Sequence, residues 1–116
     1  MDTILHITRR EDWETAVTTP PYRADSLETD GFIHCSTIEQ VLKPANEMFH
    51  GQTGLVLLVI DSAKVQADII YEDCYESGQE FPHIYGPLNL DAVVQVFDFP
   101  PDADGSFSLP VELRKL

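Results

Sequence analysis

The sequence contains few positive charges and no long hydrophobic run. Seven Lys and Arg residues stand against twenty Asp and Glu residues, which gives a net charge of −13. Such an excess of acid repels phosphate backbones and anionic lipids, so we expect neither a nucleic-acid partner nor a membrane-surface role. The longest apolar run, residues 55–60, is strand-sized and far shorter than the ~20 residues needed to span a bilayer.

Cysteine and targeting signals are also scarce. Only Cys35 and Cys74 are present, and their spacing matches no metal-binding motif, so we expect two free thiols in a reducing compartment. The first residues lack a basic stretch followed by an apolar one, which predicts no secretory signal and a cytoplasmic location. A length of 116 residues predicts one domain that spans residues 1–116.

The hydrophobic pattern predicts an α+β arrangement of strands and helices. We expect strands over residues 3–8, 32–35, 55–60, 67–72 and 92–99, and helices over residues 9–18 and 37–50. Both helices lie in the N-terminal half, which favours α+β over a regular α/β fold. The uninterrupted apolar character of residues 55–60 indicates a strand covered on both faces.

Two capping boxes mark the expected helix starts. Thr8 with Glu11, and Ser36 with Glu39, have the spacing of a hydroxyl cap and its reciprocal carboxylate. We therefore predict that the Thr8 and Ser36 hydroxyls cap the two helices. Removing the Ser36 cap is expected to cost ~1 kcal/mol.

The connecting segments differ in composition. Residues 73–80 are polar and contain Gly78, which predicts a loop over the site. Residues 81–88 contain two prolines and a glycine, which predict an irregular but locally rigid backbone. From residue 100 onward Pro, Asp, Gly and Ser are frequent, so residues 100–116 are expected to form a loosely packed tail.

Three of the four histidines lie in or beside short apolar segments. His6, His34 and His83 each occur in a strand-like context, whereas His50 falls at the end of an expected helix. Imidazole titrates near neutrality, donates and accepts hydrogen bonds, and binds metals. We predict that these three histidines face one cleft, with three unrelated structural histidines as the alternative.

Metal and nucleophile chemistry are less well supported. A catalytic zinc takes three protein ligands and a water, but no histidine pair here has the short helical spacing typical of such sites. We therefore assign no metal ligands and expect no stoichiometric zinc. The sequence identifies no histidine partner for Cys35 as a nucleophile, and it contains no Walker loop or GxGxxG motif.

Two sequence blocks carry a family resemblance. The chain resembles the domain-of-unknown-function 952 family in Gly31-Phe32-Ile33-His34-Cys35-Ser36 with Gln40, and in Phe81-Pro82-His83-Ile84-Tyr85-Gly86-Pro87-Leu88. Ile4-Leu5-His6, Trp13 and residues 55–61 match as well. That family is similar to the ADP-ribosylation fold of ADP-ribosyltransferases and RNA 2′-phosphotransferases. The resemblance implies a split, bent, mainly antiparallel sheet with a cleft for NAD or an ADP-ribose group.

The resemblance also implies roles for individual residues. His6 matches the residue that holds the nicotinamide ribose, and His34-Cys35-Ser36 matches the motif that shapes the nicotinamide pocket. His83 and Tyr85 match the late strand that faces this pocket. His34 and His83 are thus the candidate catalytic residues, and His6, Cys35, Ser36 and Tyr85 the candidate ligand-binding residues.

The chain departs from the transferases at one position and in its number of arginines. Where they carry a glutamate on the late strand, this chain has His83, and only four arginines are present. We therefore expect a cytosolic domain whose histidine-lined cleft binds or processes NAD or an ADP-ribose-like nucleotide, with an ADP-ribosyltransferase-like or NAD-processing enzyme as the favoured form. The alternative is a non-catalytic module for a small ligand or a protein. Alanine at Tyr85 is expected to impair both folding and function, and alanine at His83 mainly function.

Overall fold

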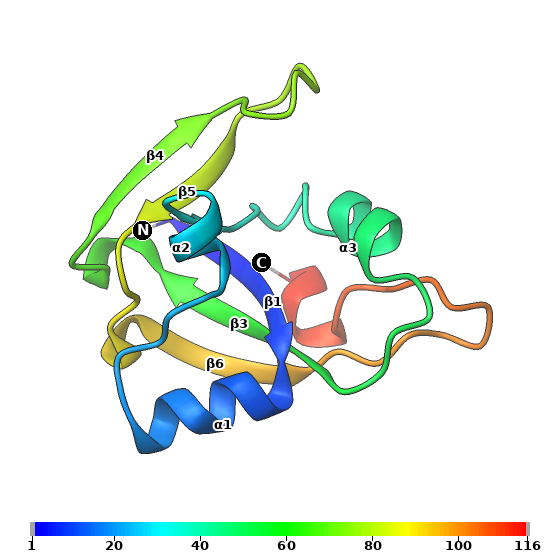
Figure 1. Ribbon diagram of the computed structural model, residues 1–116. Helices are drawn as coiled ribbons and strands as arrows, with labels where there is room; N and C mark the ends of the chain where they lie inside the picture. The colour runs from blue at the N-terminus through cyan, green and yellow to red at the C-terminus, as the bar shows by residue number, and fades with distance from the viewer. Residues whose placement is uncertain (1, 116) are drawn as a thin grey trace.

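The computed structural model describes residues 2–115 and has an α+β fold, as predicted (Figure 1). Two antiparallel sheets of three strands form its framework. The first has the order β1-β3-β6, with β1 at Thr3–Arg9, β3 at Leu55–Asp61 and β6 at Val93–Asp98. The second has the order β2-β5-β4, with β2 at Ile33–His34, β5 at Phe81–Tyr85 and β4 at Asp68–Glu72.

Short helices cover the sheets and connect them. They are α1 (Arg10–Thr18), α2 (Ser26–Thr29) and α3 (Leu42–Met48), with 3-10 turns η1 (Ser62–Lys64), η2 (Leu90–Ala92) and η3 (Val111–Lys115). In Figure 1 the β4–β5 hairpin rises above the first sheet, and the red η3 turn lies beside α3. None of the helices within residues 2–115 has the length and apolarity needed to cross a bilayer.

Strand β3 lies between two hydrophobic clusters. All seven of its residues are buried, which confirms the strand predicted to be covered on both faces. Because side chains alternate along a strand, Val56, Leu58 and Ile60 pack with the second sheet. Leu55, Leu57 and Val59 pack on the other side, with α3 and the C-terminal segment.

One isolated bridge joins the two sheets, and a second joins two connecting segments. Leu5 and Ser36 exchange backbone hydrogen bonds of 2.7 and 2.9 Å, and Tyr22 pairs with Leu88 in the same antiparallel way. The first bridge holds the end of β2 against the middle of β1. It therefore places His34 beside His6, although the two residues belong to different sheets.

The two predicted helix caps were wrong. Thr8 lies within β1, and neither α1 nor α3 has a side-chain cap hydrogen bond. Ser36 is engaged in the bridge to β1, so α3 begins only at Leu42, and the Thr37 amide instead donates to Gln40 Oε1 at 3.1 Å. A long-range strand pairing overrides the local capping pattern because it joins two buried segments.

Residues 100–115 differ from the loosely packed tail expected from their composition. Phe107 and Leu113 are 4% and 3% exposed, and Phe107 stacks on Phe99 with ring centroids 4.8 Å apart. The Phe107 amide also donates to Asn46 Oδ1 at 2.7 Å. A few widely spaced apolar side chains attach this segment to the core. The sequence pattern did not reveal them because Pro, Asp and Ser residues separate them.

The second motif block is more regular than expected. Residues 81–85 form β5, whose first four residues are buried, and β5 lies between β2 and β4 in its sheet. Pro82 lacks an amide proton, but its carbonyl accepts from the Cys35 amide at 3.1 Å. The proline therefore still contributes to the contact between β5 and the end of β2.

Candidate functional site: two adjoining cavities and a histidine array

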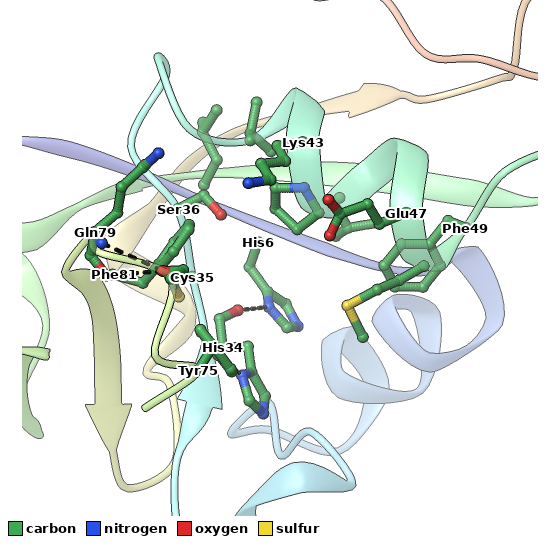
Figure 2. A pocket seen from close by; sticks show the side chains of 16 residues that line it. His6, His34, Cys35, Ser36, Lys43, Glu47, Phe49, Tyr75, Gln79 and Phe81 are labelled. Carbon is green, nitrogen blue, oxygen red and sulfur yellow. Dashed lines mark hydrogen bonds between the residues drawn. The ribbon is translucent and has the colours of Figure 1, made fainter. Parts of the chain in front are cut away.

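A cavity of about 440 Å³ lies between the end of β2, α3 and the loop 73–80 (Figure 2). Most of its lining is apolar, from residues such as Val41, Met48 and Phe81. Its polar lining includes His6, His34, Ser36, Tyr75 and Gln79. Tyr75, Ser77 and Gln79 come from residues 73–80, which form a loop, as predicted, and border this cavity.

A second cavity of about 600 Å³ opens beside α1 and residues 19–26. It shares His6, Ile7 and Phe49 with the first cavity, so the two adjoin at these residues. Arg9 and Arg23 both line it. Arg9 pairs with Glu11 and Asp12, whereas Arg23 forms no ion pair with any residue between 2 and 115.

His6 is held by hydrogen bonds at both ring nitrogens. Nδ1 lies 2.6 Å from the His34 carbonyl oxygen, and Nε2 lies 2.7 Å from the Tyr22 hydroxyl. Burial lowers the His6 pKa to about 4, so the ring is neutral at pH 7. Nδ1 must then carry the proton that the carbonyl accepts, and Nε2 must accept from Tyr22. Thr8 Oγ1, 3.0 Å from the Tyr22 oxygen, completes this buried network.

The lowered pKa of His6 makes stability depend on pH. Its usual pKa is 6.5 and its folded pKa is about 4, so between these values the unfolded chain binds more protons than the folded one. Stability is therefore lost as pH falls from 6.5 to 4, by about 3 kcal/mol for this group. Urea melts at pH 7 and pH 4 give the drop in unfolding free energy between these pH values. We expect this drop to be about 3 kcal/mol smaller in His6→Gln than in wild type.

A matched control separates His6 from the other titrating groups. His50 is exposed just after α3, so His50→Gln removes a histidine that is not buried. The change expected in His6→Gln should exceed any change in this variant. If His6→Gln follows the wild-type curve across this range, then His6 is not a buried neutral histidine.

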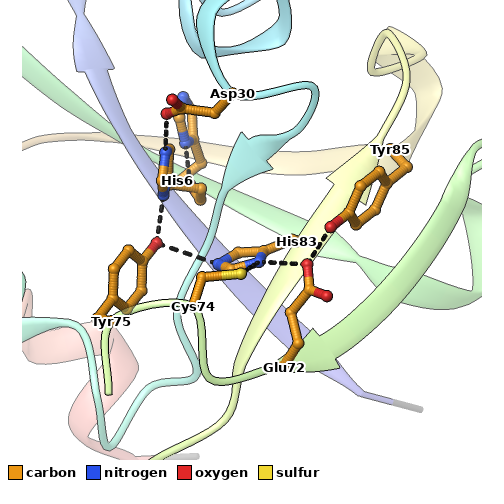
Figure 3. Close-up of polar contacts among 8 residues, drawn as sticks. His6, Asp30, Glu72, Cys74, Tyr75, His83 and Tyr85 are labelled. Carbon is orange, nitrogen blue, oxygen red and sulfur yellow. Dashed lines mark hydrogen bonds and ion pairs between the residues drawn. The ribbon is translucent and has the colours of Figure 1, made fainter. Parts of the chain in front are cut away.

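A chain of hydrogen bonds links four further side chains to Tyr75 (Figure 3). His34 Nε2 lies 2.8 Å from Asp30 Oδ2, and His34 Nδ1 is hydrogen-bonded to the Tyr75 hydroxyl. On the other side, that hydroxyl lies 3.1 Å from His83 Nε2. His83 Nδ1 lies 2.9 Å from Glu72 Oε1. His34 and His83 therefore each contact a carboxylate at one ring nitrogen and the Tyr75 hydroxyl at the other.

The register of the second sheet creates this array. His34 of β2 is the cross-strand partner of His83 in β5, so their side chains lie on the same face of the sheet. The ring centroids are 5.5 Å apart, and the Tyr75 hydroxyl lies between the rings. The His83 ring is fully buried and stacks on Phe32 at a centroid distance of 4.0 Å.

Glu72 is the carboxylate at the His83 end of the array. The Tyr85 hydroxyl donates to the same carboxylate oxygen as His83, and these bonds lower the pKa of Glu72 below its ordinary value. The same bond raises the pKa of Tyr85 to about 12, and burial raises that of Tyr75 to about 12. At neutral pH both phenols therefore keep their protons and Glu72 is an ionised acceptor.

Four of the six candidate site residues predicted from sequence line the first cavity, and the other two do not. His6, His34, Cys35 and Ser36 line the first cavity. The Ser36 hydroxyl does not cap α3, and its side chain faces the cavity (Figure 2). His83 is buried behind Tyr75, and Tyr85 borders neither cavity. Burial raises the pKa of the Cys35 thiol, which disfavours the thiolate that a nucleophile needs.

Sequence reasoning missed four polar members of the site: Tyr22, Asp30, Glu72 and Tyr75. None belongs to either motif block. Asp30 stands four residues before His34, and Glu72 ends the strand before the loop, so neither position has a distinctive local pattern. Pairing of β4 with β5 brings Glu72 to His83, and the loop folds Tyr75 between the histidines.

The fold and this array define an α+β protein with two antiparallel sheets and histidines paired across β2 and β5. The family profile described as "Protein of unknown function (DUF952)" matches residues 7–96, and the chain belongs to that family. The chain is also similar to protein CC0527 from Caulobacter crescentus, with 33% sequence identity. No curated protein matches it.

Three solved structures of CC0527 share this fold. Its crystal structure and that of a double mutant each have a TM-score of 0.86, with 97% of this chain and 98% of theirs covered. The solution NMR structure has a TM-score of 0.80, with 100% and 97% covered.

Proposed function

We propose that the two adjoining cavities bind NAD or an ADP-ribose-like nucleotide. The observation that carries the proposal is their junction at His6, with a largely apolar compartment on one side and, on the other, one whose charged lining is Arg9, Arg23, Asp12 and Asp25. Arg9 pairs with Asp12, which leaves Arg23 to face an anionic group. Each volume lies in the range of small-molecule sites, about 300–1,000 Å³. Together they offer an elongated site for a ligand with a flat ring at one end and phosphates further along.

The first cavity suits a nicotinamide-like ring. Apolar side chains offer contact to both faces of a planar heterocycle, and the Ser36 side chain offers a hydrogen bond to its amide. Tyr75 adds a second hydroxyl, because it lines the same cavity. This placement agrees with the implied role of His34-Cys35-Ser36 in shaping the nicotinamide pocket.

The second cavity suits the phosphate and ribose groups. Arg23 forms no ion pair within residues 2–115, so it is available to an anionic ligand. Guanidinium groups bind phosphate through paired hydrogen bonds. Of the two arginines that line this cavity, only Arg23 lacks an ion pair within residues 2–115. One such cation in a chain of net charge −13 favours a small nucleotide over a polynucleotide.

The same residues favour NAD processing through His34 rather than ADP-ribosyl transfer of the usual kind. His34 lines the cavity and is oriented by Asp30, as a general acid or base would be. The transferases' glutamate is replaced here by His83. The resemblance to the ADP-ribosylation fold, with its split antiparallel sheet, supports the ligand class more than the transfer chemistry.

A non-catalytic binding module is the second candidate. One observation favours it: every ring nitrogen of His6, His34 and His83 already has a partner inside the protein. Such histidines shape a cavity without exchanging protons with a ligand. Release of nicotinamide from NAD by wild type, abolished in His34→Gln, would favour the enzyme; binding without release would favour the module.

Binding is tested by calorimetric titration with NAD, ADP-ribose and nicotinamide. Removing the arginine in Arg23→Ala should weaken ADP-ribose about tenfold or more, since a hydrogen bond to a charged group contributes about 1.5–3 kcal/mol. Nicotinamide affinity should not change, because the ring has no phosphate. Ser36→Ala should weaken NAD and nicotinamide together.

Lys64→Ala is the matched control. Lys64 is exposed in η1 and borders neither cavity, so the variant removes one positive charge elsewhere. It should bind all three ligands as wild type does. Equal losses in Arg23→Ala and Lys64→Ala would mean that only net charge matters, and no heat with any ligand would refute the proposal.

A further inference from the structure

The β4–β5 hairpin brings together three side chains of different chemistry (Figure 3). Glu72 ends β4, Cys74 follows in the loop, and His83 lies on β5. One ligand atom from each, a carboxylate oxygen, Sγ and a ring nitrogen, all lie within 4.8 Å of one another. His83 Nδ1 lies 2.9 Å from Glu72 Oε1 and 3.9 Å from Cys74 Sγ.

Two histidine ring nitrogens share the Tyr75 hydroxyl in the array beside this cluster. His34 directs its Nε2 proton to Asp30, and His83 directs its Nδ1 proton to Glu72. His34 Nδ1 and His83 Nε2 both face the Tyr75 hydroxyl. A ring that carries only the proton directed at its carboxylate has none on this second nitrogen. That hydroxyl has a single proton for two nitrogen contacts. Two singly protonated rings would therefore leave one of the two contacts without a hydrogen.

A cation on His83 Nδ1 removes this shortage. The ring proton then resides on Nε2 and is donated to the Tyr75 oxygen. Tyr75 donates its own proton to His34 Nδ1, and His34 Nε2 still donates to Asp30. Every contact from His83 to Asp30 then contains one hydrogen. A metal-bound histidine usually donates the N–H of its other ring nitrogen to an acceptor, and this hydrogen bond fixes the ring orientation.

We propose that Glu72, Cys74 and His83 form a Zn²⁺ site on the β4–β5 hairpin. Carboxylate, thiolate and imidazole are all zinc ligands. Bond lengths of about 2.0–2.3 Å in a tetrahedron place ligand atoms roughly 3.3–3.6 Å apart. The observed 2.9 and 3.9 Å are within about 0.5 Å of that spacing.

The ion has access from solvent and keeps one open position. Cys74 is exposed and the Glu72 side chain is 28% exposed, whereas the His83 ring is fixed beneath them. Three protein ligands leave a fourth position for water. On binding, the Cys74 thiol releases one proton to solvent, because the thiolate is the metal ligand. From sequence we expected no metal ligands. The pairing of β4 with β5 brings these three side chains together, and the sequence spacing alone does not show this.

Cobalt is the probe, because Co²⁺ occupies zinc sites and a bound thiolate gives it a charge-transfer absorption. Titrating the full-length, nucleotide-free chain should produce this absorption with one equivalent of Co²⁺. Zn²⁺ should abolish it by displacement, since zinc binds such sites more tightly. Cys74→Ser should remove the absorption and weaken Zn²⁺ binding by more than about a hundredfold, because even outer hydrogen-bond partners contribute about 10–100-fold.

Two further variants complete the test. Cys35→Ala removes the other thiol, which is buried in the core, and should leave the absorption unchanged. Tyr75→Phe removes the acceptor for the His83 Nε2 proton and should weaken Zn²⁺ about tenfold. Absence of the absorption in wild type at millimolar Co²⁺, or its persistence in Cys74→Ser, would overturn the proposal. The nucleotide proposal stands or falls separately, because no nucleotide is present in this titration.

Discussion

Replacing Phe107 by alanine is expected to destabilise the protein by about 3–5 kcal/mol, the range for truncating a buried aromatic residue. The ring is 4% exposed and stacks on Phe99 in the cluster that covers one face of β3. Its removal leaves a cavity beside α3 and weakens the attachment of the C-terminal segment. Urea unfolding followed by circular dichroism measures the loss.

Val111→Ala serves as the control for this experiment. Val111 lies in the same C-terminal segment but is 60% exposed, so its truncation should change stability by no more than about 0.5 kcal/mol. If Phe107→Ala is as stable as Val111→Ala, residues 100–115 form the loosely packed tail that their composition suggests.

The second large effect is expected at His83. Alanine there should cost roughly 2–5 kcal/mol, as for other large buried side chains. It removes a fully buried ring that stacks on Phe32 and leaves Glu72 and Tyr75 without their shared partner. Tyr85→Ala should cost less, because Tyr85 is 38% exposed. The structure therefore reverses the order of stability loss expected from sequence.

Thermal or urea melts of both variants, prepared without added metal, measure this order. His50→Ala is the matched control, since His50 is exposed and should tolerate alanine within about 0.5 kcal/mol. A loss in Tyr85→Ala equal to or greater than that in His83→Ala would show that the buried ring contributes little, and that the contacts of Tyr85 hold this end of β5.

Strand β3 illustrates what could be predicted from sequence. Its continuous apolar run has one physical solution in a small domain, which is burial on both faces, and the structure has it. Helix α1 was predicted nearly to the residue for the same reason, since a local pattern determined it. Where local patterns competed with long-range pairing, as for Ser36 in its bridge to Leu5, the prediction failed.

The site shows the same division between local and long-range information. His6, His34 and His83 stood out because polar rings are unusual within apolar segments. Their arrangement was not predictable, because the contact of His34 with His83 depends on the register of β2 with β5. Tyr75 gave no signal in a polar loop, although its hydroxyl joins the two rings.

The sequence by itself determined the α+β class, the buried β3 strand, the loop at residues 73–80 and the three histidines in apolar segments. These features depend on composition and short-range periodicity, and both can be read from one short stretch of the chain. Only the tertiary structure decided which atoms meet. The bridge to Ser36 places His34 beside His6, and the β4–β5 hairpin carries Glu72 and Cys74 to His83. Such contacts join residues far apart in the chain, and strand register and packing fix them.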